Sequence, residues 1–187
     1  MSELRVDGRS FSDFRRPVLK FGIIPGVPSL QYQVNSNLLL VSIKPASKFR
    51  IVCVPSASAQ TFFYQIKSSQ QMLTSVFSKL ISNQLEFRIN ILASDRTLQT
   101  HLFNACMILL IQSGFQLEAV PFAMSAYVKN ENILIDDERM NAMFITDEND
   151  CYYSQRSGIG CQQINEVYGV VKEAVKGYTE YVMEIGK

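Results

Sequence analysis

One nearly unbroken apolar stretch, residues 93–114, constrains the fold of this chain more than any other feature. Ser94 and Asp95 are residue types that favour the N-cap of a helix, and Gly114 favours its C-terminal end. Between them, apolar residues recur at helical spacing on most faces: Leu98, Leu102, Ala105, Cys106, Leu109 and Leu110. A helix this apolar must lie in the centre of a fold. Its polar N-terminus, with Arg96 in the first turn, would then lie at the edge of a sheet and offer backbone N–H groups to an anion.

The length and composition fit one folded domain, residues 1–187. Apolar residues make up 47% and charged residues 19% of the chain, which excludes an intrinsically disordered protein. The net charge is only +1, so any contact with nucleic acid must be local.

The four cysteines, Cys53, Cys106, Cys151 and Cys161, show no C-x-x-C spacing, and Cys106 lies in the predicted buried helix. This pattern favours reduced thiols in an intracellular protein over a disulfide framework. The first ten residues are polar and charged, which argues against a secretory signal, and no apolar run is long enough for a membrane span.

Hydrophobic periodicity predicts an α+β fold with a mixed sheet, two inner helices and a C-terminal amphipathic helix. Strand patterns cover residues 18–24, 30–34, 38–43, 50–54, 87–91, 120–128, 133–135 and 143–146, and a short last strand starts at Tyr152. Asn35-Ser36-Asn37 and Asn130-Glu131-Asn132 predict hairpin turns. Helical patterns cover residues 68–83, 93–114 and 164–185, of which the last is the clearest.

No metal or cofactor site is indicated. The single histidine, His101, lies inside the predicted buried helix and is interpreted as a core or interface residue, so a zinc site is not expected. Dedicated nucleotide-binding loops are absent. Two acidic groups are interpreted as solvated turns rather than metal ligands: Asp136-Asp137-Glu138, and Asp147 with Glu148 and Asp150. The basic amino end is either an ordinary charged surface or a contact for RNA phosphates or an acidic partner: Arg5, Arg9, Arg15, Arg16 and Lys20.

The order of several motifs resembles the RNase PH-like family over nearly the whole chain. Its opening R-x-D-G-R…R…G is matched by Arg5 to Arg9, then Arg15 or Arg16, then Gly22. The family's G-S-x-x-x-x-x-G-x-T-x-V-L hairpin is replaced by residues 28–40, which keep Ser29 and an apolar strand without the glycines. Three later signatures of the family are similar to segments of this chain. The strand–D-G-G-T-R–helix signature is similar to residues 92–99, and the alanine-rich helix that ends in A-G is similar to residues 103–114. The strand–L-D signature is similar to residues 133–136. The resemblance implies an RNase PH-like domain (ribosomal protein S5 domain 2-like).

The resemblance also implies that this chain has lost the family's chemistry. In active members phosphate attacks the terminal RNA linkage, which requires cations around the phosphate and carboxylates that bind a metal or supply a proton. Gln99 stands where the phosphate-binding arginine belongs, and Ala142 stands at the second carboxylate, while Asp136 matches the first. Residues 57–63 lack the cations of the family's arginine-rich stretch. Arg96 is a candidate substitute from a different position of the turn. We expect no catalytic residue and an inert chain.

The chain therefore resembles the inactive core-ring subunits of the eukaryotic RNA exosome. This implies a structural role in 3′-5′ RNA processing and degradation, rRNA processing included, in the nucleus (nucleolus) and cytoplasm. The implied partners are other RNase PH-like subunits, the RNA-binding cap proteins and RNA, with no membrane. Candidate RNA contacts are Arg50, Arg88, Arg96 and Gln99. Aromatic residues at Phe62, Phe63, Tyr64, Tyr152 and Tyr153 are candidates for ring interfaces, with core packing as the equal alternative.

Two other functions stay open. One is a phosphate-dependent 3′-5′ exoribonuclease that completes its site with an adjacent subunit. The other is an unrelated α+β interaction module with no role on RNA.

Overall fold

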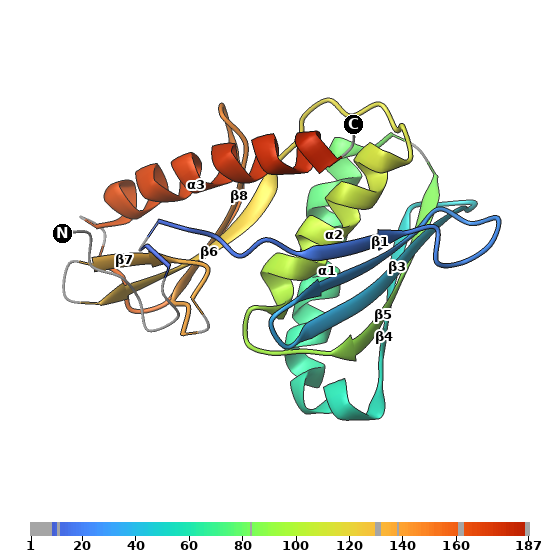
Figure 1. Cartoon of the computed structure of the whole chain (residues 1–187), viewed down its shortest axis with the longest axis horizontal. Coiled ribbons are helices and arrows are strands. Elements are labelled where there is room, and N and C mark those ends of the chain that lie inside the picture. Colours follow the sequence, from blue (N-terminus) through green and yellow to red (C-terminus); the bar gives the residue numbers. More distant parts are fainter. Residues whose placement is uncertain are drawn as a thin grey trace. The chain divides into compact units, whose positions relative to one another are not determined.

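The computed structural model describes residues 9, 10, 12–82, 84–129, 132–137, 139–160 and 163–185 (Figure 1). Its contacts divide the chain into two compact units. The five-stranded unit is Arg16–Val120, and the four-stranded unit combines Met1–Arg15 with Pro121–Lys187. The expectation that the whole chain forms one domain stays a prediction.

The five-stranded sheet has the strand order β1-β2-β3-β5-β4, from β1 (Val18–Phe21), β2 (Ser29–Val34), β3 (Asn37–Pro45), β4 (Arg50–Pro55) and β5 (Leu85–Ala93). Strands β4 and β5 run parallel, and the other neighbours are antiparallel, so the predicted mixed sheet is confirmed. The predicted hairpin between β2 and β3 is also confirmed, since Val34 pairs with Asn37 across a turn in which Asn35 has a φ of 49°.

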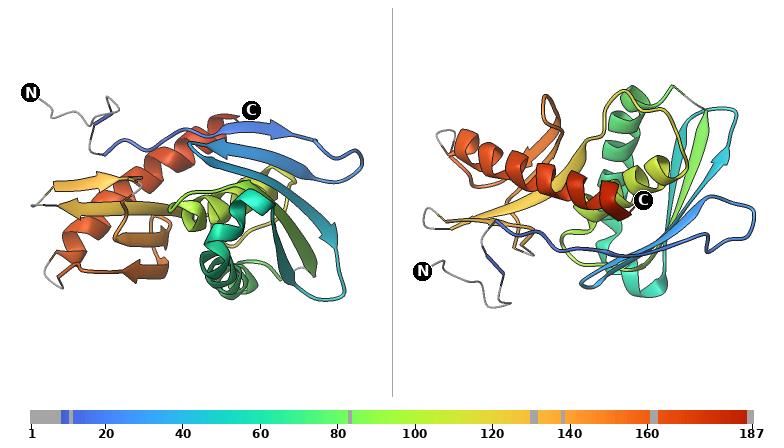
Figure 2. Two further views of the ribbon diagram at one scale, coloured as in Figure 1. Left: turned by 90° about the horizontal axis from the view of Figure 1, so that it is seen from below. Right: turned by 45° about the horizontal axis from the view of Figure 1, so that its top comes forward.

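Helices α1 (Phe63–Leu80) and α2 (Leu98–Gln112) lie on the same side of this sheet (Figures 1 and 2). Their side chains cover the sheet face formed by alternate buried residues, which include Leu30, Tyr32, Val41, Phe87 and Ile89. The ring of Phe77 on α1 stacks on Phe87 at 5.5 Å and on Phe103 of α2 at 4.8 Å, measured between ring centroids. Aromatic stacking thus joins the sheet and both inner helices in one core.

Helix α2 is buried at every position from Leu98 to Leu110, as its composition predicts. Its start was predicted wrongly: the N-cap is Thr97, not Ser94 or Asp95. Asp95 instead holds a turn before the helix, because its Oδ1 accepts the N–H of Thr97 at 2.8 Å. The predicted stop is correct. Gly114 has a φ of 72°, and the N–H groups of Gly114 and Phe115 bond back to the last helical turn in a Schellman motif.

The four-stranded sheet has the strand order β7-β6-β8-β9, entirely antiparallel, from β6 (Phe122–Lys129), β7 (Asn132–Ile135), β8 (Ala142–Thr146) and β9 (Cys151–Arg156). Lys129 pairs with Asn132 as the second predicted hairpin requires, although residues 130 and 131 lie outside the described residues. Helix α3 (Ile164–Ile185) packs on this sheet through Val167, Val171, Val175, Tyr178 and Val182, and its bounds are those predicted.

Other element ends differ from the predictions. Helix α1 starts at Phe63, earlier than residue 68, directly after the short 3₁₀-helix η1 (Ala57–Phe62) that the sequence analysis missed. Strand β1 ends at Phe21 instead of residue 24, because the chain turns at Gly22, whose φ is 66°. Among the described residues, no helix is both long and apolar enough to cross a membrane.

Candidate functional site

The carboxyl ends of the parallel strands β4 and β5 lie side by side, with Pro55 paired to Ile91. Just beyond them, Ser56 and Ser58 both donate hydroxyl hydrogen bonds to the carbonyl of Leu92, at 2.9 and 3.0 Å. The chain then enters η1 after β4 and α2 after β5. Ends of parallel strands that lead into helices are common ligand sites in α/β folds. We call this region, residues 94–100 together with Asn37, the strand-end site.

A polar network holds the strand-end site in place. Asn37, the first residue of β3, donates through Nδ2 to Asp95 Oδ1 at 2.8 Å and to Thr97 Oγ1 at 3.1 Å. The N–H of Asp95 returns a bond to Asn37 Oδ1 at 3.1 Å. Asp95 Oδ1 also accepts from the N–H of Thr97 at 2.8 Å and from its hydroxyl at 2.6 Å. The carboxylate of Asp95 is therefore fixed at the N-terminal end of α2.

Four buried polar atoms of the strand-end site have no hydrogen-bond partner within the described structure: Ser94 Oγ, Asp95 Oδ2, Gln99 Nε2 and Thr100 Oγ1. The side chains of Gln99 and Thr100 belong to residues that are only 3% and 1% exposed. Buried polar groups are normally paired, so this concentration within seven residues distinguishes the site from an ordinary core.

The described part of the strand-end site has no buried cation for phosphate. Its buried ionisable group is the carboxylate of Asp95, and Gln99 contributes only a neutral amide. Arg96 is exposed, and its backbone carbonyl is held by Gln65 Nε2 at 2.8 Å. A neutral amide cannot replace a permanently charged, bidentate guanidinium. The arrangement can accept neutral polar groups or water, and it offers an anion no buried positive charge.

Asp136, the match to the family's first carboxylate, is not in a solvated turn, so that prediction is wrong. It is 2% exposed, because its Oδ2 accepts the N–H of Arg15 at 2.8 Å and lies 3.8 Å from Arg9 Nη1. Its backbone adopts a left-handed φ of 55°, which is rare for residues other than glycine. Asp137 is also largely buried, in a bidentate pair with Arg139. Glu138 lies outside the described residues.

The position predicted to have lost the second carboxylate, Ala142, is a core residue at the start of β8. It is 2% exposed and pairs with Ala126 of β6. A carboxylate in this position would be buried in the sheet. Among the described residues, no group of three or more histidine, cysteine or acidic side chains is placed to hold a metal ion.

The second acidic group does form a turn, between β8 and β9. Asp147 Oδ1 accepts the N–H groups of Asn149 and Asp150, and its Oδ2 accepts the hydroxyl of Tyr152 at 2.9 Å. Partial burial alone would raise the pKa of Asp147, but these hydrogen bonds and the charge of Lys172 outweigh it and lower the pKa. The turn is stabilised by the ionised carboxylate.

His101 is a core histidine, as predicted. It is 3% exposed, and its Nδ1 lies 3.0 Å from the hydroxyl of Tyr32. Cys53, Cys106 and Cys151 are free thiols, while Cys161 lies outside the described residues. Burial raises the pKa of Cys53 to about 12, which keeps this thiol protonated and unreactive at neutral pH.

The four candidate RNA contacts do not form one site. Arg96 and Gln99 lie at the strand-end site, after β5 ends. Arg50 starts β4 and Arg88 lies in the middle of β5, roughly 15–25 Å away along the strands, on the sheet face opposite to the buried Phe87 and Ile89. Arg50 is already engaged there, since its guanidinium pairs with the buried carboxylate of Glu86. Arg88 and Arg96 are exposed.

The candidate interface aromatics also separate. Tyr64 is 87% exposed, whereas Tyr152 and Tyr153 are half-buried. The side chains of Phe62 and Phe63, and the residues Arg5, Asp7 and Gly8 of the opening motif, lie outside the described part of the chain.

Asn37 is the functional-site residue that the sequence analysis missed, because it was interpreted only as a turn residue. It is fully buried, in line with Leu39, Val41 and Ile43 along β3. Extending the alternation of that strand back by one step could have identified it.

Comparisons with known proteins bear on this geometry at the level of the fold. No protein-family model matches the chain, and no curated protein matches it in sequence. Among solved structures, Rrp46 of rice (Oryza sativa) superposes with a TM-score of 0.79 at 12% identity, covering 98% of this chain and 100% of that one. An archaeal exosome core chain gives 0.69 at 14% identity, covering 96% and 91%. A chain of the Archaeoglobus fulgidus exosome with RNA bound to the active site gives 0.66 at 13% identity, covering 95% and 92%.

The chain thus has the RNase PH-like fold of exosome subunits over nearly its full length, and the α+β class and the resemblance predicted from the sequence are confirmed at this level.

Proposed function

We propose that this chain is a non-catalytic structural subunit of an RNA exosome core ring, where it scaffolds the ring and helps form the RNA channel. One observation carries the proposal: at the N-terminal end of α2, the buried side chain in the position of the phosphate-binding arginine is the neutral amide of Gln99. The match in fold to exosome chains over at least 95% of this chain supports the place in a ring.

Phosphorolysis would fail here for an electrostatic reason. The reaction needs a bound phosphate beside the terminal RNA linkage, and charge on that phosphate must be balanced by cations. At the strand-end site Gln99 contributes a neutral amide in place of the charged guanidinium. Losing one charged contact to the transition state costs on the order of a few kcal/mol. Asp136 and Ala142 support the same conclusion, since one is bound by Arg15 and the other is packed in β8.

The proposed partners are other RNase PH-like subunits, the RNA-binding cap proteins and RNA. Arg88 and Arg96 are the exposed cations that we propose as RNA contacts. The proposed role is in RNA processing and degradation, rRNA processing included, and it implies locations in the nucleus (nucleolus) and the cytoplasm.

The test is a phosphorolysis assay on the purified chain and on its complex with a co-expressed RNase PH-like subunit. Both are incubated with single-stranded RNA, inorganic phosphate and magnesium. We expect a stable hetero-oligomer by native mass measurement and no phosphate-dependent release of nucleoside diphosphates from the chain alone.

The control is the same complex with the partner's own catalytic site inactivated. Nucleoside diphosphate release by the chain alone would overturn the non-catalytic role. Release by the complex with the inactivated partner would instead identify an exoribonuclease that is active only with a partner subunit. Failure to form any complex with ring subunits would favour an interaction module with no role on RNA.

A further inference from the structure

We propose that the free edge of β1 is a docking site for an extended strand of another protein. In this docking, a bulky apolar side chain of the partner strand fills a hollow beside Phe21, and a carboxylate of the same strand faces Lys20. The inference concerns the five-stranded unit alone and does not depend on the identity of the partner as an exosome subunit.

The backbone of β1 has hydrogen-bonding groups that its own sheet does not use. The N–H of Gly22 donates to the carbonyl of Ser29 at 2.9 Å, which fixes the alternation of bonds along the antiparallel pair of β1 and β2. By this alternation, the backbone N–H and C=O groups of Lys20 and Val18 also face β2. The N–H and C=O groups of the intervening residues, Leu19 and Phe21, therefore point away from the sheet. In the described structure these groups have no hydrogen-bond partner.

The opposite edge of the same sheet, at β4, is protected. The side chain of Gln70 on α1 donates through Nε2 to the carbonyl of Ile51 at 2.7 Å, and Pro55 ends the strand. Side-chain caps and prolines are common protections against unwanted strand pairing. Strand β1 is short and carries Lys20, but its two outward-facing residues lack any such cap.

Apolar side chains are exposed along and just after the β1 edge. Val18 is 59% exposed, Phe21 39% and Ile23 40%. Scattered single exposed apolar residues are normal, but here Val18 and Phe21 lie on the edge strand itself, one on each of its faces, and Ile23 follows directly after it. An edge that only needed protection from other strands would carry polar side chains at these positions.

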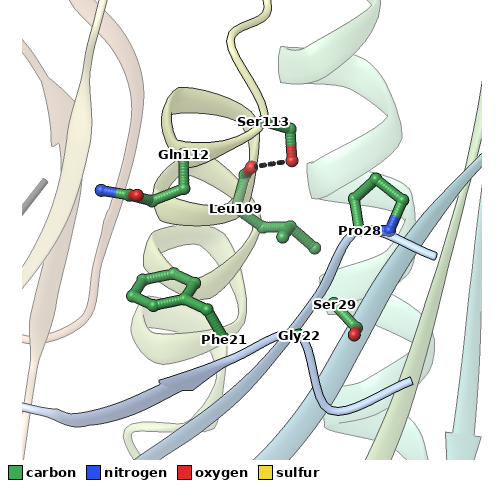
Figure 3. A pocket seen from close by; sticks show the side chains of 7 residues that line it. All are labelled: Phe21, Gly22, Pro28, Ser29, Leu109, Gln112 and Ser113. Carbon is green, nitrogen blue, oxygen red and sulfur yellow. Dashed lines mark hydrogen bonds between the residues drawn. The ribbon is translucent and has the colours of Figure 1, made fainter. Parts of the chain in front are cut away.

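A hollow of about 280 Å³ lies at the end of this edge, between β1 and the C-terminal part of α2 (Figure 3). Phe21, Pro28 and Leu109 form its apolar lining. The hydroxyls in its wall are already engaged: Ser29 Oγ accepts the N–H of Ile24 at 2.8 Å, and Ser113 Oγ donates to the carbonyl of Leu109 at 2.6 Å. The hollow therefore suits an apolar side chain and has room for a leucine or phenylalanine.

A second copy of this chain is a poor occupant in an antiparallel arrangement. Symmetric pairing centred on Lys20 sets two lysines directly opposite, which is destabilising. Pairing centred on Leu19 sets Phe21 opposite Pro17, which has no N–H to donate. Pairing centred on Phe21 sets Leu19 opposite Ile23, beyond the end of the strand. A different chain with a carboxylate opposite Lys20 avoids all three problems.

The test uses the full ¹⁵N-labelled chain and three short blocked peptides with alternating threonine and valine. The first peptide carries a phenylalanine and a glutamate placed opposite Lys20, the second replaces the glutamate by lysine, and the third replaces the phenylalanine by alanine. Amide hydrogen exchange and chemical-shift titration are measured at Leu19 and Phe21.

We expect the first peptide to slow amide exchange at Leu19 and Phe21 in a saturable way. The lysine peptide should bind about threefold more weakly and the alanine peptide about tenfold more weakly. Lys20→Glu should reverse the preference between the glutamate and lysine peptides, whereas Lys48→Glu, an exposed lysine outside β1, should leave it unchanged.

Three results would overturn the proposal. The first is unchanged amide exchange at Leu19 and Phe21 with all three peptides. The second is a charge preference that Lys20→Glu does not reverse. The third is a concentration-dependent dimer of the chain alone, seen by sedimentation, whose formation protects these two amides.

Discussion

Asn37 and Asp95 hold each other by two hydrogen bonds of opposite direction, from Asn37 Nδ2 to Asp95 Oδ1 at 2.8 Å and from Asp95 N to Asn37 Oδ1 at 3.1 Å. The pair joins the start of β3 to the turn before α2, across 58 residues of sequence. It fixes both the position of the central helix and the carboxylate at its N-terminus. Fold stability and the chemistry of the strand-end site therefore depend on the same two side chains.

We expect Asn37→Leu to lower the free energy of unfolding by about 2–3 kcal/mol, because it removes the hydrogen bonds that Asn37 makes to the Asp95 carboxylate and to Thr97. Urea unfolding monitored by circular dichroism measures the change. Ser36→Ala in the adjacent exposed turn is the control and should change stability by less than about 0.5 kcal/mol. An Asn37→Leu variant as stable as this control would contradict the role of the pair.

We expect Gln99→Arg not to restore phosphorolysis. The new guanidinium would supply one cation, but Ala142 would still supply no carboxylate and residues 57–63 would still supply no cation. Nucleoside diphosphate release from RNA in the presence of phosphate is the measurement. Gln99→Lys is the matched comparison, since it adds the same charge without the bidentate guanidinium. Measurable phosphorolysis by the single variant would refute this expectation.

The stability of the five-stranded unit should fall in acid through Glu86. A hydrogen bond from Lys44 is the largest effect on the pKa of this carboxyl and lowers it below its usual 4.5; burial opposes the shift, and Arg50 adds to it. Because the folded-state pKa is lower than the unfolded one, the stabilisation is complete above about pH 4.5 and is lost as pH falls through the folded-state pKa. Unfolding midpoints in urea between pH 7 and pH 3 test this.

The matched variants for this pH test are Glu86→Gln and Glu118→Gln. Glu86→Gln should be less stable at pH 7 and should lose stability less steeply below pH 4.5, because its side chain cannot titrate. Glu118 is exposed, and its replacement should leave the acid slope of the wild type in place. Parallel slopes for wild type and Glu86→Gln would argue against this carboxyl as the source.

Phe103→Ala should destabilise the chain by about 3–5 kcal/mol, the usual cost of removing a fully buried phenylalanine. Its ring stacks on Phe77, so the loss includes packing between α1 and α2. Thermal and urea unfolding measure the effect. Tyr64→Ala removes an aromatic ring that is 87% exposed, and it should stay within about 0.5 kcal/mol of wild type. If the two variants were equally stable, the assignment of Phe103 to the central core would be wrong.

The elements that the sequence predicted best are those whose pattern is local. Helix α3 has one apolar stripe with a polar remainder, and its bounds were predicted as observed. The start of α2 was wrong because Asp95 bonds to Asn37, a partner far away in the sequence. Helix-capping preferences depend only on neighbouring residues, so they cannot predict such a tertiary hydrogen bond. The same reason explains Asp136, whose burial depends on Arg9 and Arg15.

The candidate site was predicted in outline only. The sequence predicted that the N-terminal end of the central helix faces a sheet edge and that Gln99 there is neutral. In the structure, Gln99 lies in the first turn of α2, just after the end of β5. The sequence did not indicate that Arg50 is committed to Glu86, because the two residues meet only through the register of β4 against β5. A sequence shows which residues near a predicted sheet edge are cationic. Only the tertiary structure shows which of these cations already form ion pairs within the protein and which can still contact RNA.

Asp95 Oδ1 accepts hydrogen bonds from the side chain of Asn37 and from both the N–H and the hydroxyl of Thr97. One carboxylate oxygen therefore ties the first residue of β3 to the N-cap of α2. Because the two elements share this oxygen, the first turn of the central helix and the β2–β3 hairpin should lose their amide protection together rather than one after the other.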